Sequence, residues 1–430
     1  MMMGPPRGAS PPVDPNAPRE SMFAPLANRS FRWLFVSNLA FFFAMGSQTV
    51  VRAWLAFDMT QSEFALGMTM VAAAVPMLFM SPIGGAVADR LDRRAIIMAG
   101  QALAFLSQAA ILVLILSDRL AFWHLIASAL VMGSVFPFIM PARQAIVVNI
   151  VGKKGLQRTL ALSMVGMNAT RMIGPAAGGF LISFGGVEAA YALGVGLFLL
   201  SLGFMLGVER VRAVPRAVPQ TLVRGVQEGL FYVRENRLIL VLLSFGLVPM
   251  FLAMPFQNLL VVFSEKVWDT GPVGLGILSS ASGVGGMVGA LWVAAKPEGA
   301  RLRRMMLSVV SFGSLLMLFS FSPWFGAAVA LVLFANIFAS AFQTLNNTVI
   351  QLLIPDEVRG RISSFLIMSF SLPLLGTVPI SAIAELYGAP IAVGTASAGA
   401  VVVALAFYAL SPSLRRLDED IAKTMALESS

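Results

Sequence analysis

Long apolar stretches, separated by short polar connections, are the feature that most constrains how this chain can fold. A helix needs about 20 apolar residues to cross the hydrocarbon core of a bilayer. By that length the sequence predicts an all-α membrane protein, with twelve transmembrane helices in two bundles of six. The predicted spans are residues 31–57, 64–88, 95–117, 120–141, 157–184, 187–208, 238–263, 274–296, 304–322, 325–350, 362–386 and 389–411.

The composition excludes several classes of protein. Charged residues make up 12% of the 430 residues, whereas a soluble domain has roughly 25%. The chain has no cysteine and a single histidine, His124, so the Cys- and His-based metal sites are excluded. No nucleophile–base pair and no phosphate-binding loop is visible. We therefore predict no enzyme activity, no catalytic residues, no metal and no cofactor.

The basic residues orient the predicted spans. All but four of the 30 lysines and arginines fall in the tails or in alternate connections; Arg119 and Lys266 lie on the opposite side, and Arg52 and Arg171 lie inside spans. The positive-inside rule makes the basic side, with both termini, cytoplasmic. Because these charges are scattered over short loops, they do not form a nucleic-acid surface. We expect a monomeric, multi-pass protein of the plasma or inner membrane.

The domain organisation follows from the spans and from the longest connection. The two halves also echo each other weakly, since the segment from Ala65 resembles that from Gly274 and the segment from Gln144 resembles that from Asn347. Such a duplication is typical of transporters with a substrate site between two halves. We predict a disordered cytoplasmic tail at 1–29, a six-helix bundle at 30–208, a cytoplasmic linker with a short amphipathic helix near 220–235 at 209–237, a second bundle at 238–411 and a cytoplasmic tail at 412–430.

The stretch "GGAVADRLDRR" at 84–94 resembles the signature loop between the second and third spans of the major facilitator superfamily. Asp92 stands where the family pattern has a second glycine. "WLAFDMTQS" at 54–62, "NATRMIGPAAGG" at 168–179 and "LIPDEVRGRISS" at 353–364 are similar to the drug-exporter subgroup that includes macrolide and enterobactin exporters. The resemblance covers about 31–411 and implies an antiporter-like motif at Gly174, Pro175, Gly178 and Gly179.

The resemblance also implies a role for the charges of the signature loop. An acid at a helix N-terminus is favoured by the unpaired N–H groups and by the helix dipole, and the resemblance places Asp89 at the start of the eleventh span. The expected latch closes the cytoplasmic side and breaks when the cavity opens inward. In the alternative interpretation the arginines only set the topology. The predicted latch residues are Gly85, Asp89, Arg90, Arg93, Arg94, Asp356, Glu357 and Arg361.

Polar side chains inside the spans are the candidates for lining a substrate cavity. In the alternative interpretation they are interhelical hydrogen-bond partners, which is the commoner role of such residues. The chain has 25 methionines and 32 phenylalanines, and flexible apolar surfaces of that kind suit amphipathic substrates. The cavity candidates are Gln48, Arg52, Asn168, Arg171, Gln257, Asn258, Asn336, Gln343, Asn346 and Asn347.

No aspartate or glutamate lies at the centre of any predicted span, although proton-driven transport usually needs an accessible protonatable group. Asp58 and Glu385, near the outer ends, are the candidate proton sites. The favoured function is a proton-coupled antiporter that exports small amphipathic compounds, drug-like or siderophore-like, from the cytoplasm by alternating access. The alternative is a non-pumping protein of the same fold, acting as a passive facilitator, receptor or assembly partner.

Overall fold

The computed structural model describes residues 23–209, 231, 233–295, 299–353, 375–419 and 421. Within these ranges, the side chains of residues 82, 85, 86, 88–90, 152–155 and 157 are not described. Every regular element in this part of the chain is helical, as predicted. Most of the predicted linker helix at 220–235, and most of both tails, lie outside the described residues.

The first half begins with a short 3-10 turn, η1 (Ala24–Ala27), and four helices follow it. Polar caps fix where three of them begin, because a side-chain oxygen can satisfy the free N–H groups of a first turn. Asn28, Ser62 and Asp92 each accept a hydrogen bond from the backbone of the helix that follows. The helices are α1 (Arg29–Thr60), α2 (Glu63–Arg90), α3 (Arg93–Leu116) and α4 (Phe122–Met205).

The 84 residues of α4 contain more than one membrane span. A straight helix of that length would extend about 126 Å, whereas the hydrocarbon core is roughly 30 Å thick. The chain reverses at Gly186, whose φ of 75° is accessible to glycine without strain. On either side of this reversal, Pro175 packs against Gly46 of α1 and the carbonyl of Ala190 accepts a hydrogen bond from Gln48 Nε2. Both predicted spans, 157–184 and 187–208, are therefore present.

The second half continues the helical pattern. Its first span is split into α6 (Arg237–Ala253), α7 (Phe256–Val262) and the π-helical turn η2 (Phe263–Val267). The remaining elements are α8 (Gly271–Ala294), α9 (Arg301–Ser320), α10 (Phe325–Leu353), α13 (Thr377–Tyr387), α14 (Ala389–Leu410) and α15 (Pro412–Arg415).

The described helices account for the predicted number of spans. Ten segments are long and apolar enough to cross a membrane. One of them, Arg158–Met205, contains two passes because of the reversal at Gly186. Of the predicted span at 362–386, the structure describes the end, which is α13, and the first part lies outside the described residues. Twelve passes in two bundles fit this arrangement.

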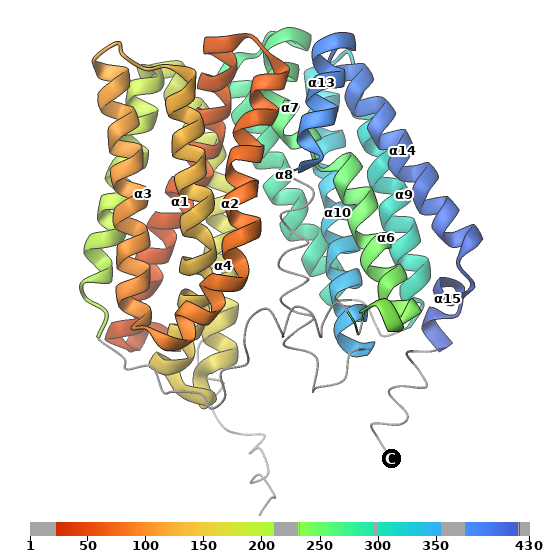
Figure 1. Ribbon diagram of the computed structural model, residues 1–430, viewed down its shortest axis with the longest axis horizontal. Coiled ribbons are helices and arrows are strands. Elements are labelled where there is room, and N and C mark those ends of the chain that lie inside the picture. Colours follow the sequence, from red (N-terminus) through yellow and green to blue (C-terminus); the bar gives the residue numbers. More distant parts are fainter. Residues whose placement is uncertain are drawn as a thin grey trace, which may run out of the picture.

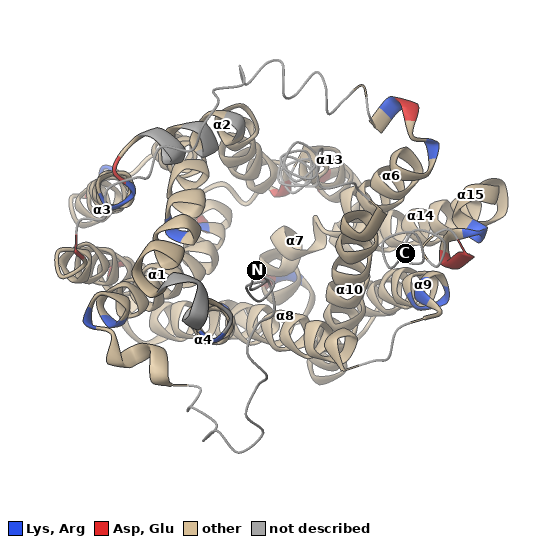
Figure 2. Ribbon diagram, turned by 90° about the horizontal axis from the view of Figure 1, so that it is seen from below, with Lys and Arg blue, Asp and Glu red and all other residues tan. Residues whose placement is uncertain are grey.

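The two halves stand side by side with their helices roughly parallel (Figure 1). We call the end that carries Glu63, Phe122 and Tyr387 the Glu63 face, which is uppermost in Figure 1. The opposite end, with Arg93, Arg237 and Arg301, is the Arg93 face. Figure 2 looks onto the Arg93 face and shows Lys and Arg segments around its rim, on α3, α4 and α9 among others.

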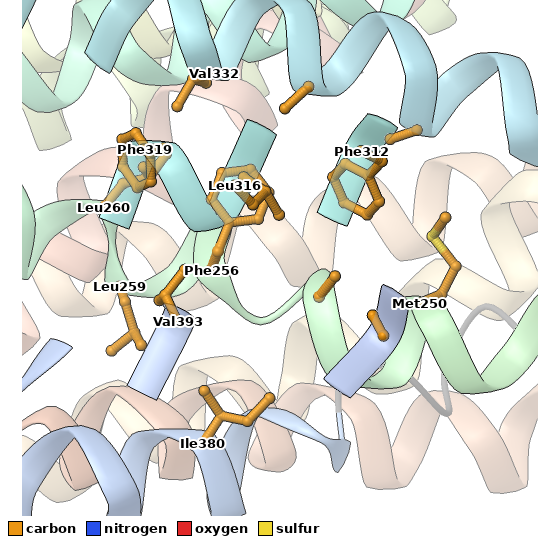
Figure 3. Packing of buried hydrophobic residues seen from close by; sticks show 14 of the residues in the cluster. Met250, Phe256, Leu259, Leu260, Phe312, Leu316, Phe319, Val332, Ile380 and Val393 are labelled. Carbon is orange, nitrogen blue, oxygen red and sulfur yellow. The ribbon is translucent and has the colours of Figure 1, made fainter. Parts of the chain in front are cut away.

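Aromatic and branched side chains form the interior of the second half (Figure 3). Phe312, Leu316 and Phe319 of α9 are fully buried, and the ring centroids of Phe256 and Phe319 lie 6.2 Å apart. The first half has a smaller cluster in which Phe41 of α1 meets Phe198 of α4 edge to face, at 5.5 Å. Close packing of this kind holds helices together where lipid removes the hydrophobic driving force.

Candidate transport site

A break in the seventh span marks the centre of the candidate site. Helix α6 ends at Ala253 and α7 begins at Phe256, with Met254 and Pro255 in a turn between them. Proline lacks an N–H group and clashes with the preceding turn, so it interrupts a helix. Transporters commonly build their substrate sites from such discontinuous helices. The predicted span over 238–263 is confirmed, because Arg237–Val267 forms one candidate membrane span, and the turn at Met254 and Pro255 lies within it.

Side-chain amides gather immediately after this break. Gln257 Nε2 lies 3.4 Å from Asn336 Oδ1 on α10, and Asn258 Nδ2 lies 3.2 Å from Thr377 Oγ1 on α13. Asn336 also donates to the carbonyl of Val332 at 2.9 Å and is buried, whereas Gln257 is exposed. An amide can both donate and accept hydrogen bonds. Of this cluster, Gln257 is the side chain best placed to meet a ligand.

The other candidates on α10 occupy different environments. Asn346 is buried, and its amide packs against Gly246 of α6 while its Oδ1 has no hydrogen-bond partner. Gln343 and Asn347 are half-buried. Asn346 therefore contributes to packing between α6 and α10, and the other two remain cavity candidates.

The candidates in the first half also divide into buried packing contacts and side chains that are at least partly exposed. Gln48 is buried and donates to the carbonyl of Ala190 at 3.2 Å, which is a contact between helical passes. Asn168 is half-buried and Arg171 is exposed. Arg52 is half-buried, its Nε has no hydrogen-bond partner, and it interacts electrostatically with the buried Tyr191. Of these, Arg52 has the clearest unused hydrogen-bonding capacity.

The glycines of the antiporter-like motif make two kinds of close contact. Gly174 and Gly178 lie against Ser47 and its neighbours on α1, within the first half. Gly179 instead faces Pro272 and Gly276 of α8, in the second half, and a Cβ at position 179 would collide with the Pro272 carbonyl oxygen. Small residues let helices approach closely. The motif therefore packs α4 against α1 of its own half and against α8 of the second half.

The described charges of the signature loop each make a contact within the first half. Asp92 Oδ1 accepts from the backbone N–H groups of Arg94 and Ala95, so Asp92 caps α3. Arg93 Nη1 donates to the Ala145 carbonyl at 3.2 Å, and Arg94 Nη2 donates to the Leu206 carbonyl at 2.8 Å. Leu206 is the C-terminal cap of α4, where a cation is favoured by the helix dipole.

The rest of the predicted latch is only partly described. The backbones of Gly85, Asp89 and Arg90 belong to the last turns of α2, but their side chains are not among those described. Asp356, Glu357 and Arg361 lie outside the described residues. The pairing of Asp89 with the eleventh span thus stays a prediction.

Arg143 corrects one expectation from the sequence, which counted it with the cytoplasmic loops. It lies inside α4 and is 4% exposed. Its guanidinium donates from Nη1 to Asn38 Oδ1 and lies 4.3 Å from the centre of the Phe41 ring, while Nε and Nη2 have no hydrogen-bond partner. The predicted span stopped at residue 141, but α4 continues through Pro137 and Pro141.

Acidic side chains at the Glu63 face join the two halves. Glu385, near the end of α13, accepts from Ser62 Oγ at 3.0 Å and from the backbone N–H of Phe64 at 3.1 Å. Glu63, which the sequence also places near the outer end of its span, pairs with Lys266 at 2.8 Å. Asp58 is exposed at the same face. No group of acidic, histidine or cysteine side chains in the described ranges is arranged to hold a metal ion.

The comparisons with known proteins decide the family. Residues 20–428 match the family described as transmembrane secretion effectors, MFS_3. The chain belongs to this family of the major facilitator superfamily. It is therefore a multi-pass membrane transporter that resembles drug exporters, and not an enzyme.

Individual relatives agree with this assignment. The chain is 27% identical to the multidrug efflux pump Tap of Mycolicibacterium fortuitum, over 74% of the chain and 80% of that protein. It is 23% identical to macrolide efflux protein A of Streptococcus pyogenes, again over 74% and 80%. In fold it resembles a mutant of the nucleoside transporter NupG with a TM-score of 0.74, at 15% identity over 88% of this transporter and 99% of NupG.

Proposed function

We propose that this transporter is a secondary active exporter that moves small amphipathic compounds, drug-like or siderophore-like, out of the cytoplasm in exchange for protons. The efflux proteins among its relatives support the direction and the substrate class. The basic rim of the Arg93 face supports a cytoplasmic position for that face and for both termini. The protein acts as a monomer in the plasma or inner membrane, and the Glu63 face is external.

The observation that carries this proposal is the break between α6 and α7. It sets the exposed amide of Gln257 beside Asn336 on α10, and Figure 2 places α7 near the middle of the molecule. A helix that is interrupted within its span, with side-chain amides beside the interruption, is suited to bind a substrate that each bundle can release. The half-buried Gln343 and Asn347 on α10, together with Arg52, extend the proposed site.

Alternating access is supported by where the halves touch. Glu385 and Lys266 of the second half bind α2 of the first half at the Glu63 face. On the Arg93 face, Arg93 and Arg94 donate to carbonyls of their own half. This arrangement fits a state closed to the outside. In the opposite state the proposed latch, with Asp89 and Arg90 on one half and Asp356, Glu357 and Arg361 on the other, closes the cytoplasmic side.

Proton coupling is assigned to an acid near one face, because the described acids lie near the faces and not at mid-membrane. Asp58 is exposed and interacts electrostatically with Glu265 of η2. It is the acid we assign to accept the proton from outside. The non-pumping alternative differs in a measurable way, since a facilitator equilibrates its ligand without a proton gradient.

A substitution at Gln257 tests the substrate site. Gln257→Leu keeps the approximate size of the side chain but removes one hydrogen-bonding group, and one hydrogen bond contributes about 0.5–1.5 kcal/mol. We expect a roughly twofold to tenfold rise in KM for polar amphipathic substrates, with little change for purely apolar dyes. Efflux from vesicles that contain equal amounts of each variant measures this difference.

The matched control is Thr348→Val on α10, where the exposed hydroxyl bonds only to the Thr344 carbonyl of its own helix. We expect this variant to transport every compound as the parent does. If Gln257→Leu also left the whole compound profile unchanged, the site would lie elsewhere.

A further inference from the structure

A carboxylate from one half occupies a helix N-terminus of the other half. Glu385 Oε2 lies 3.0 Å from the hydroxyl of Ser62, the cap of α2, and 3.1 Å from the N–H of Phe64 in its first turn. The first N–H groups of a helix have no partner within the helix. Their partial positive charge favours an anion. The ionised form of Glu385 thus binds α2 more strongly than the neutral form.

An ion pair joins the same two halves beside this contact. Lys266 Nζ of η2 lies 2.8 Å from Glu63 Oε1, and 5.1 Å from the centre of the Phe57 ring. The Glu63 side chain is 7% exposed, while that of Lys266 is 46% exposed. A buried carboxylate costs free energy unless it is paired. When the halves separate at this point, the Glu63 carboxylate loses its ion pair and must be hydrated by water instead.

The backbones approach each other just below these charges. Gly67 of α2 faces Ser381 and Thr377 of α13, and a Cβ at position 67 would lie 3.0 Å from the Ser381 Cβ. Above them lies a cavity of about 410 Å³, lined by Gln61, Glu63, Lys266 and Glu385 among others. Glu385 is itself exposed. Protons from the solvent on this face can therefore reach the carboxylates without passing through the substrate site.

We propose that Glu385, with the Glu63–Lys266 pair, forms an external latch between α2 and the second half, and that acid outside the cell opens it. The orientation rests on the proposed function. The device mirrors the latch predicted for the Arg93 face, where Asp89 near the end of α2 would meet the start of the eleventh span. The same two spans thus hold each face closed in turn. At the Glu63 face the acid belongs to the eleventh span and the helix N-terminus to α2, and in the predicted latch at the Arg93 face these roles are exchanged.

The charges around Glu385 determine the direction of the pH effect. Glu63 of α2 interacts with Glu385 directly, through its backbone N–H and its carboxyl group, and lines the same cavity as Lys266 of η2. Tyr387 follows on α13, and on α14 the titratable group is Tyr408 at the far end. The closed latch binds the carboxylate, so protonation weakens the closed state. An acid that carries a proton inward must keep that proton while the protein is closed to the outside, whereas the closed latch favours the ionised form of Glu385. Glu385 is therefore a gate and not the proton carrier, and Asp58 remains the candidate for that role.

Distances between spin labels at the Glu63 face test the latch. The labels replace Ser117 and Pro323, which are exposed at this face on different halves, and the chain has no cysteine of its own. The full-length protein in nanodiscs is measured without substrate at neutral pH and at about pH 4, because a glutamate side chain takes up its proton near pH 4.3 and hydrogen bonds to the ionised form delay this further. In the parent we expect acid to populate a longer distance. Glu385→Gln should show that distance at both pH values, with the closed-to-open ratio lowered roughly twofold to thirtyfold.

Two further variants make the result decisive. Glu188→Gln removes an exposed acid of the first half that lies by the turn at Gly186, and it should respond to pH as the parent does. Ser62→Ala removes one donor to Glu385 and should shift the distances in the same direction as Glu385→Gln, but less. A parent distance that ignores pH, or a Glu385→Gln variant that retains the parent's pH response, would overturn the latch. Because no transport is measured, absence of export would count against the proposed function and not against the latch.

Discussion

Gly179→Ala should abolish most transport while the protein still inserts and folds. A methyl group at this position meets the Pro272 carbonyl of α8, so α4 and α8 must separate for the variant to be accommodated. Overpacking of a tight contact costs about 1–3 kcal/mol, which is roughly a fivefold to hundredfold change in a two-state ratio. Since this contact joins the two halves, the cost falls on the state that is closed at the Glu63 face. Efflux rates and the label distances described above measure the two consequences.

Gly196→Ala is the matched control, because a Cβ at position 196 of the same helix has no atom within 4 Å. We expect it to transport as the parent does. Gly174→Ala provides a second comparison, since Gly174 contacts α1 of its own half and not α8. Normal transport by Gly179→Ala would show that the antiporter-like motif has no role in bringing the halves together.

Asn38→Leu should destabilise the protein strongly, whereas Arg143→Met should not. Asn38 supplies the hydrogen-bond acceptor of the buried Arg143 guanidinium, and Nε and Nη2 of that group already have no partner. Removal of one partner of a buried charge costs about 3–5 kcal/mol, while replacement of the charge by an apolar side chain of similar volume is often neutral or stabilising. Methionine can also fill the space over Phe41.

Thermal unfolding in detergent measures both variants, and the double variant isolates the interaction. We expect Asn38→Leu combined with Arg143→Met to regain most of the stability that Asn38→Leu loses. Equal stability of Asn38→Leu and the parent would mean that the guanidinium has another partner in the membrane.

The sequence predicts the helical architecture because hydrophobic length and charge placement act locally. The spans, the two bundles and the turn at Gly185 and Gly186 all follow from the length that a bilayer requires. The helix caps at Ser62 and Asp92 are also local, although they were not predicted. The seventh span was predicted, whereas the turn at Met254 and Pro255 within it was not.

The contacts between the halves could not be predicted from local sequence patterns. Glu63 and Lys266 are 203 residues apart, and Glu385 is 321 residues from Phe64. Nothing in the pattern around Gly179 distinguishes it from Gly178, yet one faces α8 and the other α1. Which side of a helix meets which neighbour depends on tertiary packing. For the same reason the polar residues of the spans could be named as candidates, but not divided into packing partners such as Gln48 and exposed groups such as Gln257.

Efflux from proteoliposomes under an imposed proton gradient is the most direct test of a proton-coupled exporter. The purified full-length protein is reconstituted with a panel of dyes, macrolides and siderophores, and transport is followed with the gradient present and after an ionophore collapses it. We expect at least one amphipathic compound to move against its concentration gradient, only while the proton gradient is present, and to stop moving in Gly179→Ala. Equilibration that is indifferent to the gradient would show a passive facilitator, and no movement of any compound would show a non-pumping membrane protein of this fold.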